Sequence, residues 1–348
     1  MHPVSNALYA PLFADPEIAA LFSTEASLAG FCDYQAALTA ALAETGQVNA
    51  DLARLALAAI DGFRPDPEGL EAVIRRDGVP VPGLLAQLRA QAGDGAVALH
   101  RGATSQDVID TTLALSLRAL FDALSGRLRG LIDRLNALVR EYGDASLMGR
   151  TRMQAALPVT ARHRIAQWRA PLSHALDGLA ALRGRVERVH YAGPVGLQDA
   201  PQAHAVIAHM ARALDLSPAP PGSHTDRAWI AETGGWLSLV TGALGKIGQD
   251  LALMAQQGLD AVRFEGGGGR SSAMPHKHNP VEAEILVALA RFNATALGGL
   301  HQALVHEQER SGAAWALEWM LLPQMAECAG AATGHADRIL ERVRGLGD

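Results

Sequence analysis

The chain has 348 residues, of which 49% are hydrophobic and 19% charged, and its formal net charge is −6. This balance predicts a globular protein with one large core or several domains, and without a basic block it disfavours nucleic acid or an anionic membrane as a partner. The two cysteines, Cys32 and Cys328, lack the spacing of a metal site or a disulfide framework, and no secretory leader or membrane-spanning apolar run is apparent, so we expect a soluble cytoplasmic protein.

The first part of the chain predicts a small helical domain. Its apolar stretches are short, because proline or glycine interrupts them. The interruptions fall at Pro16, Gly30, Gly46, Pro65, Pro67, Pro80 and Pro82. We therefore expect an N-terminal helical domain over residues 1–103 and a central long-helix domain over residues 104–348.

The central part of the chain predicts long helices. Apolar residues recur every three or four positions from Leu113 to Val139, which traces one face of a helix, and no proline occurs between Thr112 and Tyr142. Convincing alternating strands are absent. Helices of this length need partners along their whole apolar faces, so we expect an all-α fold built as a long-helix bundle. Similar patterns predict long helices over 163–191, 228–257, 281–308 and 316–344, and a short helix over 203–214.

Three segments far apart in the sequence carry polar residues suited to chemistry. The first is His100–Asp110, HRGATSQDVID, where Thr104, Ser105 and two carboxylates stand at the start of a long helix. Hydroxyl and carboxylate groups at a helix N-terminus can bind or cap, and an N-cap is the simpler interpretation of this segment alone. The second is Gly149–Thr160, GRTRMQAALPVT, which clusters arginines and a glutamine before a proline-marked helix start; a solvated turn explains it equally well.

The third segment, Gly266–Pro280, reads GGGGRSSAMPHKHNP. Its glycines allow a loop that bends anywhere, and its serines, Lys277 and Asn279 stand just before a predicted helix. Hydroxyls, a cation and an amide at a helix N-terminus can hold an anion, whereas the alternative is a simple glycine-rich connector. His276 and His278 give only a weak metal signal without further ligands, so we expect no metal and no cofactor.

In this order, the three segments resemble the signature regions of the fumarase/aspartase superfamily: His-x-Gly-x-Thr-Ser-x-Asp, Gly-x-Thr-x-x-Gln and Ser-Ser-x-Met-Pro-x-Lys-x-Asn-Pro. The resemblance extends over nearly the whole chain. It implies a long helical bundle, a homotetramer whose active sites each take the three segments from three subunits, and chemistry that moves a proton next to a carboxylate through an aci-carboxylate. It also implies a small C-terminal helical domain, which we expect to be largely missing from this chain. Arg270 and His278 depart from the family loop.

The C-terminal run His306–Pro323, HEQERSGAAWALEWMLLP, looks like the corresponding run of bacterial 3-carboxy-cis,cis-muconate cycloisomerases, as does Ser223–Glu232. That resemblance implies closure of a muconate to a lactone in protocatechuate breakdown, part of the beta-ketoadipate pathway. Arg152 fits it, because superfamily lyases that expel amines or hydroxide usually carry a histidine there as a general acid. A carboxylate that adds or leaves is stable as an anion, so a permanent cation suits it better.

The resemblance implies a polycarboxylate substrate and a role for each matching residue. Ser271 is the expected proton-transfer residue, with binding alone as the alternative, and His100 is a second candidate that could instead orient a carboxylate. Trp319 is expected in the core. A 3-sulfomuconate substrate, another lyase reaction such as that of adenylosuccinate lyase, and a non-enzymatic structural tetramer stay open. The expected substrate-binding residues are Thr104, Ser105, Thr151, Arg152, Gln154, Lys277, Asn279, Arg310 and Trp315.

Overall fold

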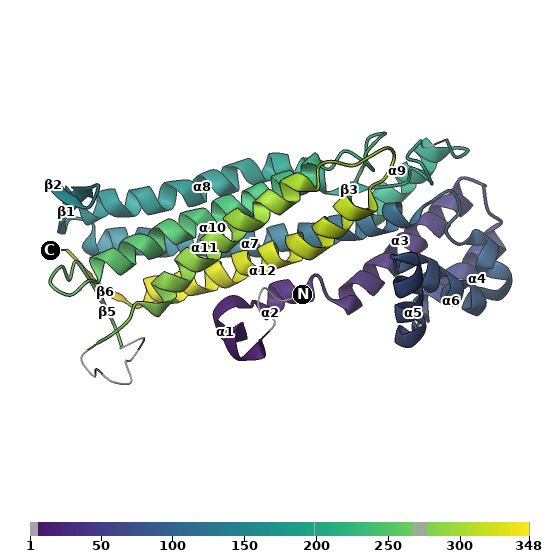
Figure 1. Ribbon diagram of the computed structural model, residues 1–348. Helices are drawn as coiled ribbons and strands as arrows, with labels where there is room; N and C mark the ends of the chain where they lie inside the picture. The colour runs from purple at the N-terminus through teal and green to yellow at the C-terminus, as the bar shows by residue number, and fades with distance from the viewer. Residues whose placement is uncertain (1–5, 198, 267–268, 270–273, 275–276, 348) are drawn as a thin grey trace.

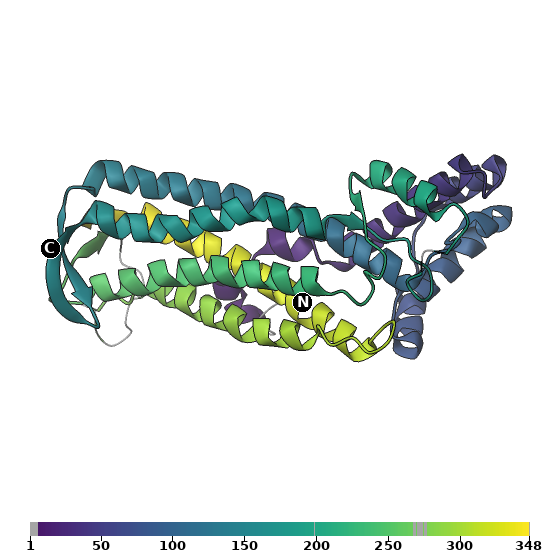
Figure 2. The same cartoon turned by 90° about the horizontal axis from the view of Figure 1, so that it is seen from above.

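The computed structural model describes residues 6–347 except 198, 267–268, 270–273 and 275–276 (Figure 1). In this part of the chain the fold is all-α with short two-stranded sheets, so the predicted fold class is confirmed. The long helices lie side by side in one bundle (Figure 1, Figure 2). They are α7 (Ser105–Tyr142), α8 (Ala161–Val186), α10 (Ala228–Met254), α11 (Val281–Gln302) and α12 (Gly312–Glu341).

Helix α7 sets the length of the bundle. Its 38 residues extend over about 57 Å at 1.5 Å per residue. The helix begins at Ser105 because the carboxylate of Asp107 accepts a hydrogen bond from the backbone N–H of the N-cap residue Thr104 at 2.9 Å. Its apolar face, fully buried at Leu117 and Leu128, packs against α8 and α12. The apolar residues predicted to recur every three or four positions therefore face the core.

A second hydrophobic cluster lies beside the start of α7 and includes Leu38 and Leu84. Helix α9 (Ala203–Leu214), much later in the sequence, adds Met210 to this cluster, whereas Ile18 from α2 lies in the bundle core. Hydrophobic contacts thus cross the predicted boundary between residues 103 and 104 in both directions, and that boundary stays a prediction. The N-terminal elements are η1 (Ala7–Tyr9), α1 (Ala10–Phe13), α2 (Pro16–Ala20), α3 (Thr24–Glu44), α4 (Ala50–Asp61), α5 (Pro67–Asp77), α6 (Val81–Ala92) and η2 (Gly93–Ala98).

The expectation that strands are absent was wrong at the second polar segment. Strands β1 (Ser146–Thr151) and β2 (Gln154–Thr160) form an antiparallel hairpin where the sequence indicated a turn before a helix. The strands were hard to predict because nearly all of β2 is exposed, so neither face carries the apolar alternation of a half-buried strand. Further pairs are parallel β3 (Arg188–Val189) with β4 (Ser217–Pro218), and antiparallel β5 (Val262–Phe264) with β6 (Val343–Leu346).

Helix α11 is long and apolar enough, by length and composition alone, to cross a membrane, contrary to the expectation that no stretch is. This property is weak support for a membrane span, because a core helix of a globular bundle passes the same test. In the bundle α11 packs along α10 and α12, and Leu286, Leu289 and Leu300 are buried there.

Candidate active site

The predicted site residues that the structure describes lie near opposite ends of α7, whose course Figure 1 shows. A helix-start group lies where α7 begins, beside the N-terminal helices, and a hairpin group lies beyond the end of α7, around the β1–β2 turn and the segment before α11. Because α7 alone extends over about 57 Å, one chain cannot gather both groups into one site. The helix-start group is His100, Thr104, Ser105, Arg310 and Trp315, and the hairpin group is Thr151, Arg152, Gln154, Lys277 and Asn279.

Asp107 anchors the start of α7 to two later segments of the chain. Its fully buried carboxylate accepts hydrogen bonds from the backbone N–H groups of Thr104 (2.9 Å), Ala192 (3.0 Å) and Gly193 (3.1 Å), and pairs with Nε2 of His224 (2.8 Å). Hydrogen bonds from backbone N–H groups to a carboxylate are strong because the acceptor is charged. One side chain thus joins the start of α7 to the turn after β3 and to the segment before α10.

A buried ion cluster around Arg227 lies next to this carboxylate. The Arg227 side chain is 1% exposed, and its guanidinium donates to Asp110 at 2.6 and 3.0 Å and to Glu318 at 2.8 and 2.6 Å. Burial opposes the charge on Asp110, but Arg227 outweighs it and holds the pKa of Asp110 below its usual value. Burial raises the pKa of Glu318 against the pull of the same arginine. These charges connect α7, the start of α10, and α12.

Arg310 meets this region through neutral partners. Its Nε donates to Oε1 of Gln106 at 2.7 Å, and its Nη2 donates to the backbone carbonyl of Pro194 at 3.2 Å. In the part of the chain that the structure describes, no carboxylate pairs with Arg310. The side chain is only partly buried, and a guanidinium is a permanent cation, so Arg310 can bind an anion as the sequence predicts.

His100 is held in a left-handed backbone conformation, with φ 61°, and its Nδ1 lies 3.0 Å from the side-chain nitrogen of Gln35. Burial lowers the pKa of His100 to about 4, although the charge of Asp107 opposes this shift. The imidazole is therefore neutral near pH 7. With Nδ1 accepting from the Gln35 amide, Nε2 carries the proton and can donate to a substrate oxygen. This arrangement favours the carboxylate-orienting role of His100 over a basic one.

The two tryptophans of α12 differ in burial. Trp315 is 4% exposed, and its Nε1 has no hydrogen-bond partner among the described residues. Trp319, which was expected in the core, is only half-buried and lines a pocket of about 260 Å³ with Phe31 and Leu322. The two rings are 4.7 Å apart, tilted by 53°. Because Trp315 is buried, a direct contact with substrate stays a prediction.

Arg152 stands at the tip of the β1–β2 hairpin. The turn residues Arg152 and Met153 have φ values of 50° and 68°, a conformation that usually requires glycine or asparagine. Strained turns of this kind cluster at functional sites. Thr151 and Gln154 pair across the turn and are exposed. A pocket of about 690 Å³ beside the turn is lined by several cations and one carboxylate: Arg150, Arg152, Arg164, Lys246 and Asp250.

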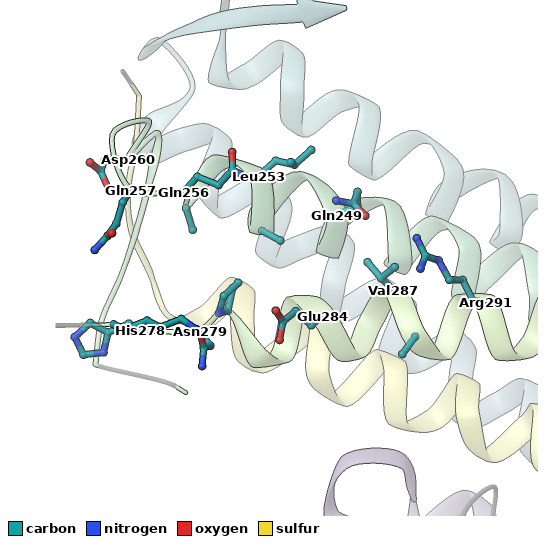
Figure 3. Close-up of a pocket in the computed structure, with 15 residues that line it drawn as sticks. Gln249, Leu253, Gln256, Gln257, Asp260, His278, Asn279, Glu284, Val287 and Arg291 are labelled. Carbon is teal, nitrogen blue, oxygen red and sulfur yellow. The ribbon is translucent and has the colours of Figure 1, made fainter. Parts of the chain in front are cut away.

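Lys277 and Asn279 line a larger pocket of about 1020 Å³ between the segment before α11 and the end of α10. In Figure 3, His278 and Asn279 come from that segment, and Gln257 lies across from them. The backbone N–H of Asn279 donates to the carbonyl of Gly269 at 3.1 Å. A Cβ at Gly269 would lie 2.5 Å from the Asn279 carbonyl, so this close approach requires glycine. The predicted Ser271, together with Arg270 and His276, lies outside the described residues.

Sequence reasoning missed Gln106, His224 and Arg227 as parts of the site. All three lie inside segments singled out for their resemblance, but only the fold shows that they meet Asp107 and Asp110. Within the described ranges, no group of three or more histidine, cysteine, aspartate or glutamate side chains is placed to hold a metal ion.

The chain is similar to known enzymes over most of its length. Residues 71–292 match a protein-family model described as lyase. The 3-carboxy-cis,cis-muconate cycloisomerase of Acinetobacter baylyi is 32% identical, with 97% of this chain and 77% of that protein covered, and that of Pseudomonas aeruginosa is 35% identical, with 97% and 75% covered. The crystal structure of the 3-carboxy-cis,cis-muconate lactonizing enzyme from Pseudomonas putida matches with a TM-score of 0.92 at 32% identity, covering 98% of this chain and 78% of that one.

The fold is that of a long-helix lyase of the fumarase/aspartase type. The chain belongs to this lyase family, as its three signature segments predict. It spans about three quarters of the length of the cycloisomerases it matches.

Proposed function

We propose that the protein is a cycloisomerase that converts 3-carboxy-cis,cis-muconate to 4-carboxymuconolactone in the protocatechuate branch of the beta-ketoadipate pathway. The observation that carries this proposal is the pocket beside the hairpin, in which Arg150, Arg152, Arg164 and Lys246 outnumber the single carboxylate Asp250. Several cations favour a substrate with several carboxylates. Similarity to enzymes of that name over nearly the whole chain supports the same choice.

The proposed reaction closes a ring and adds one proton. One substrate carboxylate attacks the nearer carbon of the remote double bond, and the new C–O bond closes the lactone ring. The electron pair of that double bond moves onto its other carbon, where the second carboxylate stabilises it as an aci-carboxylate. A proton then quenches that carbon. The attacking group is already an anion before the C–O bond forms, so Arg152 needs only to hold it, without a general acid. Ser271 is the proposed proton donor, and His100 is proposed to orient a carboxylate through its Nε2–H.

We also propose a homotetramer in which each active site takes its residues from more than one subunit. The separation of Thr104 and Arg310 from Arg152 and Lys277 along α7 supports this proposal, because each end of one chain is incomplete by itself. The proposed location is the cytoplasm, where the two free cysteines of the chain would stay reduced.

The function is tested by the ultraviolet absorbance of 3-carboxy-cis,cis-muconate mixed with the purified protein, without added metal or cofactor. We expect loss of the conjugated diene signal, abolished by Ser271→Ala and strongly reduced by Arg152→Ala. Arg140→Ala is the matched control, because Arg140 is an exposed arginine near the end of α7 without an ion-pair partner among the described residues. It should retain full turnover.

A stable diene signal would remove 3-carboxymuconate as the substrate. The next substrates are then 3-sulfomuconate, whose sulfonate carries similar charge, and succinyl adducts of the kind that adenylosuccinate lyase cleaves. Turnover of a succinyl adduct alone would identify another lyase of the family. Turnover of none of them would leave a structural tetramer that has kept the fold.

A further inference from the structure

Gln106 connects Arg310 of the helix-start group to the buried interior of the protein. Its side chain is fully buried in the first turn of α7 and makes three hydrogen bonds. The amide nitrogen donates to Oδ2 of Asp110 at 3.1 Å and to the carbonyl of His224 at 2.8 Å, and the amide oxygen accepts from Nε of Arg310 at 2.7 Å. No other side chain among the described residues contacts Arg310 through a hydrogen bond.

The partners leave the Gln106 amide only one orientation. Two acceptors, a carboxylate and a carbonyl, face its nitrogen, and a cation faces its oxygen. Rotating the amide by half a turn would place oxygen against both acceptors and an N–H donor against a guanidinium that has no acceptor. Each of these contacts would cost the hydrogen bond of a buried group. The oxygen is therefore locked toward Arg310.

Two arginines of this region are held in contrasting ways. Arg227 is enclosed by two carboxylates, Asp110 and Glu318, and its charge is satisfied inside the protein. Arg310 is held by Gln106 and by the carbonyl of Pro194, both of which are uncharged. A neutral amide fixes the direction of the guanidinium and leaves its charge for another anion. A carboxylate in the same place would pair with Arg310 and compete with a ligand.

We infer that Gln106 is a positioning residue for substrate, which aims Arg310 at a substrate carboxylate while keeping the arginine charge uncompensated. The inference rests on the proposed function, because it assigns one substrate carboxylate to Arg310. Asp110 fixes the Gln106 amide through a hydrogen bond, and Arg227 in turn fixes Asp110. The buried ion cluster therefore sets the orientation of the Arg310 guanidinium through the Gln106 amide. The inference therefore adds Gln106 to the residues that determine affinity for a polycarboxylate.

A double-mutant cycle tests this coupling. Gln106→Met keeps the length of the side chain and removes its hydrogen bonds, and Arg310→Ala removes the guanidinium. We expect Gln106→Met to raise KM for 3-carboxy-cis,cis-muconate by about tenfold with a smaller change in kcat, and to add almost nothing on the Arg310→Ala background. Gln324→Met is the matched control, because among the described residues the Gln324 side chain bonds only the Met320 carbonyl of its own helix.

Gln106→Glu distinguishes the orientation of the Arg310 guanidinium from the availability of its charge. It keeps an oxygen facing Arg310 and supplies a competing carboxylate, so we expect KM to rise although the guanidinium stays fixed. Equal effects of Gln106→Met in the presence and absence of Arg310 would overturn the inference, as would an unchanged KM in both Gln106 variants.

A second variant covers the case in which Gln106→Met fails to fold. Arg310→Lys leaves the buried amide intact and keeps the charge, but an ammonium cannot reproduce the fixed fork of a guanidinium. We expect a rise in KM of about tenfold, and an unchanged KM would show that aiming is unnecessary.

Failure of the proposed function is a separate outcome. It appears as absent turnover in the wild-type protein, and the same cycle is then measured on the affinity for citrate, an inert tricarboxylate, by calorimetry. Coupling of Gln106 and Arg310 in citrate affinity would retain the inference without the reaction. Citrate affinity that is independent of either residue would overturn it.

Discussion

Asp107 and His224 lie 117 residues apart in the sequence, yet Oδ1 of Asp107 is 2.8 Å from Nε2 of His224, and both side chains are buried. The contact joins the first turn of α7 to the segment that leads into α10. Because Asp107 also accepts from the backbone of Thr104, the predicted substrate-binding hydroxyls rest on a long-range contact and not on a helix cap alone. The N-cap and the site interpretation of this segment are therefore compatible.

Asp107→Asn should destabilise the protein. The variant keeps the shape but turns one acceptor into a donor that faces other donors, so we expect a loss of about 2–4 kcal/mol in the free energy of unfolding. Urea denaturation followed by circular dichroism measures it. Asp133→Asn is the control, because Asp133 is exposed on the same helix, and its effect should stay below about 0.5 kcal/mol. Similar values for both variants would contradict the anchoring role of Asp107.

Arg227→Met should be among the most harmful single changes. It leaves the buried carboxylates of Asp110 and Glu318 without a counter-charge, and we expect a loss of about 3–5 kcal/mol in the free energy of unfolding. Arg185→Met breaks the exposed pair with Glu232 and should cost less than about 1 kcal/mol. Thermal and urea unfolding of both variants would compare them. A small effect at Arg227 would mean that the ion cluster contributes little net stability.

The hairpin turn should trade stability against activity. Met153→Gly relieves a left-handed backbone and keeps the guanidinium, so we expect a gain of about 0.5–1 kcal/mol in stability with turnover unchanged. Arg152→Gly relieves a similar strain but removes the cation, so stability should rise while turnover falls by at least about tenfold. Melting temperature and the diene assay measure the two effects. Full turnover in Arg152→Gly would remove this arginine from the site.

Stability should decrease as pH falls from about 6.5 to about 4. Burial lowers the pKa of both His100 and His190 to about 4 in the folded protein, whereas these histidines have a pKa near 6.5 in the unfolded chain. Between these two pH values the unfolded state therefore binds more protons than the folded state. His190→Gln should reduce the slope by up to about 1.4 kcal/mol per pH unit. Urea unfolding at a series of pH values measures the slope, and His204→Gln, at an exposed position on α9, is the control. An unchanged slope in His190→Gln would show that His190 is not the group responsible.

Two variants of low activity should recover turnover when their chains assemble together. If one site takes Arg152 and Arg310 from different subunits, co-expressed Arg152→Ala and Arg310→Ala chains form some intact sites, about a quarter of the total for random assembly. Arg310→Ala mixed with Thr104→Ala is the control. Both residues lie beside the start of α7 in one subunit, so no intact site can form. No recovery in the first mixture would contradict shared sites.

The local pattern of the sequence was enough to predict much of the fold. Helix α9 runs over the predicted residues 203–214, and α7 includes the whole proline-free stretch from Thr112 to Tyr142, because both depend on apolar periodicity and on nearby helix breakers. The hairpin of β1 and β2 was missed because an exposed strand pair needs no apolar alternation. The predicted site residues were found through motif strings, which are likewise local.

The sequence by itself determined the helical bundle, the lyase family and the residue types at both ends of α7, since these follow from periodicity and contiguous motifs. Only the tertiary structure decided that Gln106 contacts Arg310 and that Asp110 and Glu318 share Arg227. Only the tertiary structure showed that the length of α7 separates the helix-start group from the hairpin group. Such contacts join residues far apart in the chain, and their partners are chosen by how the helices pack, which no local pattern records.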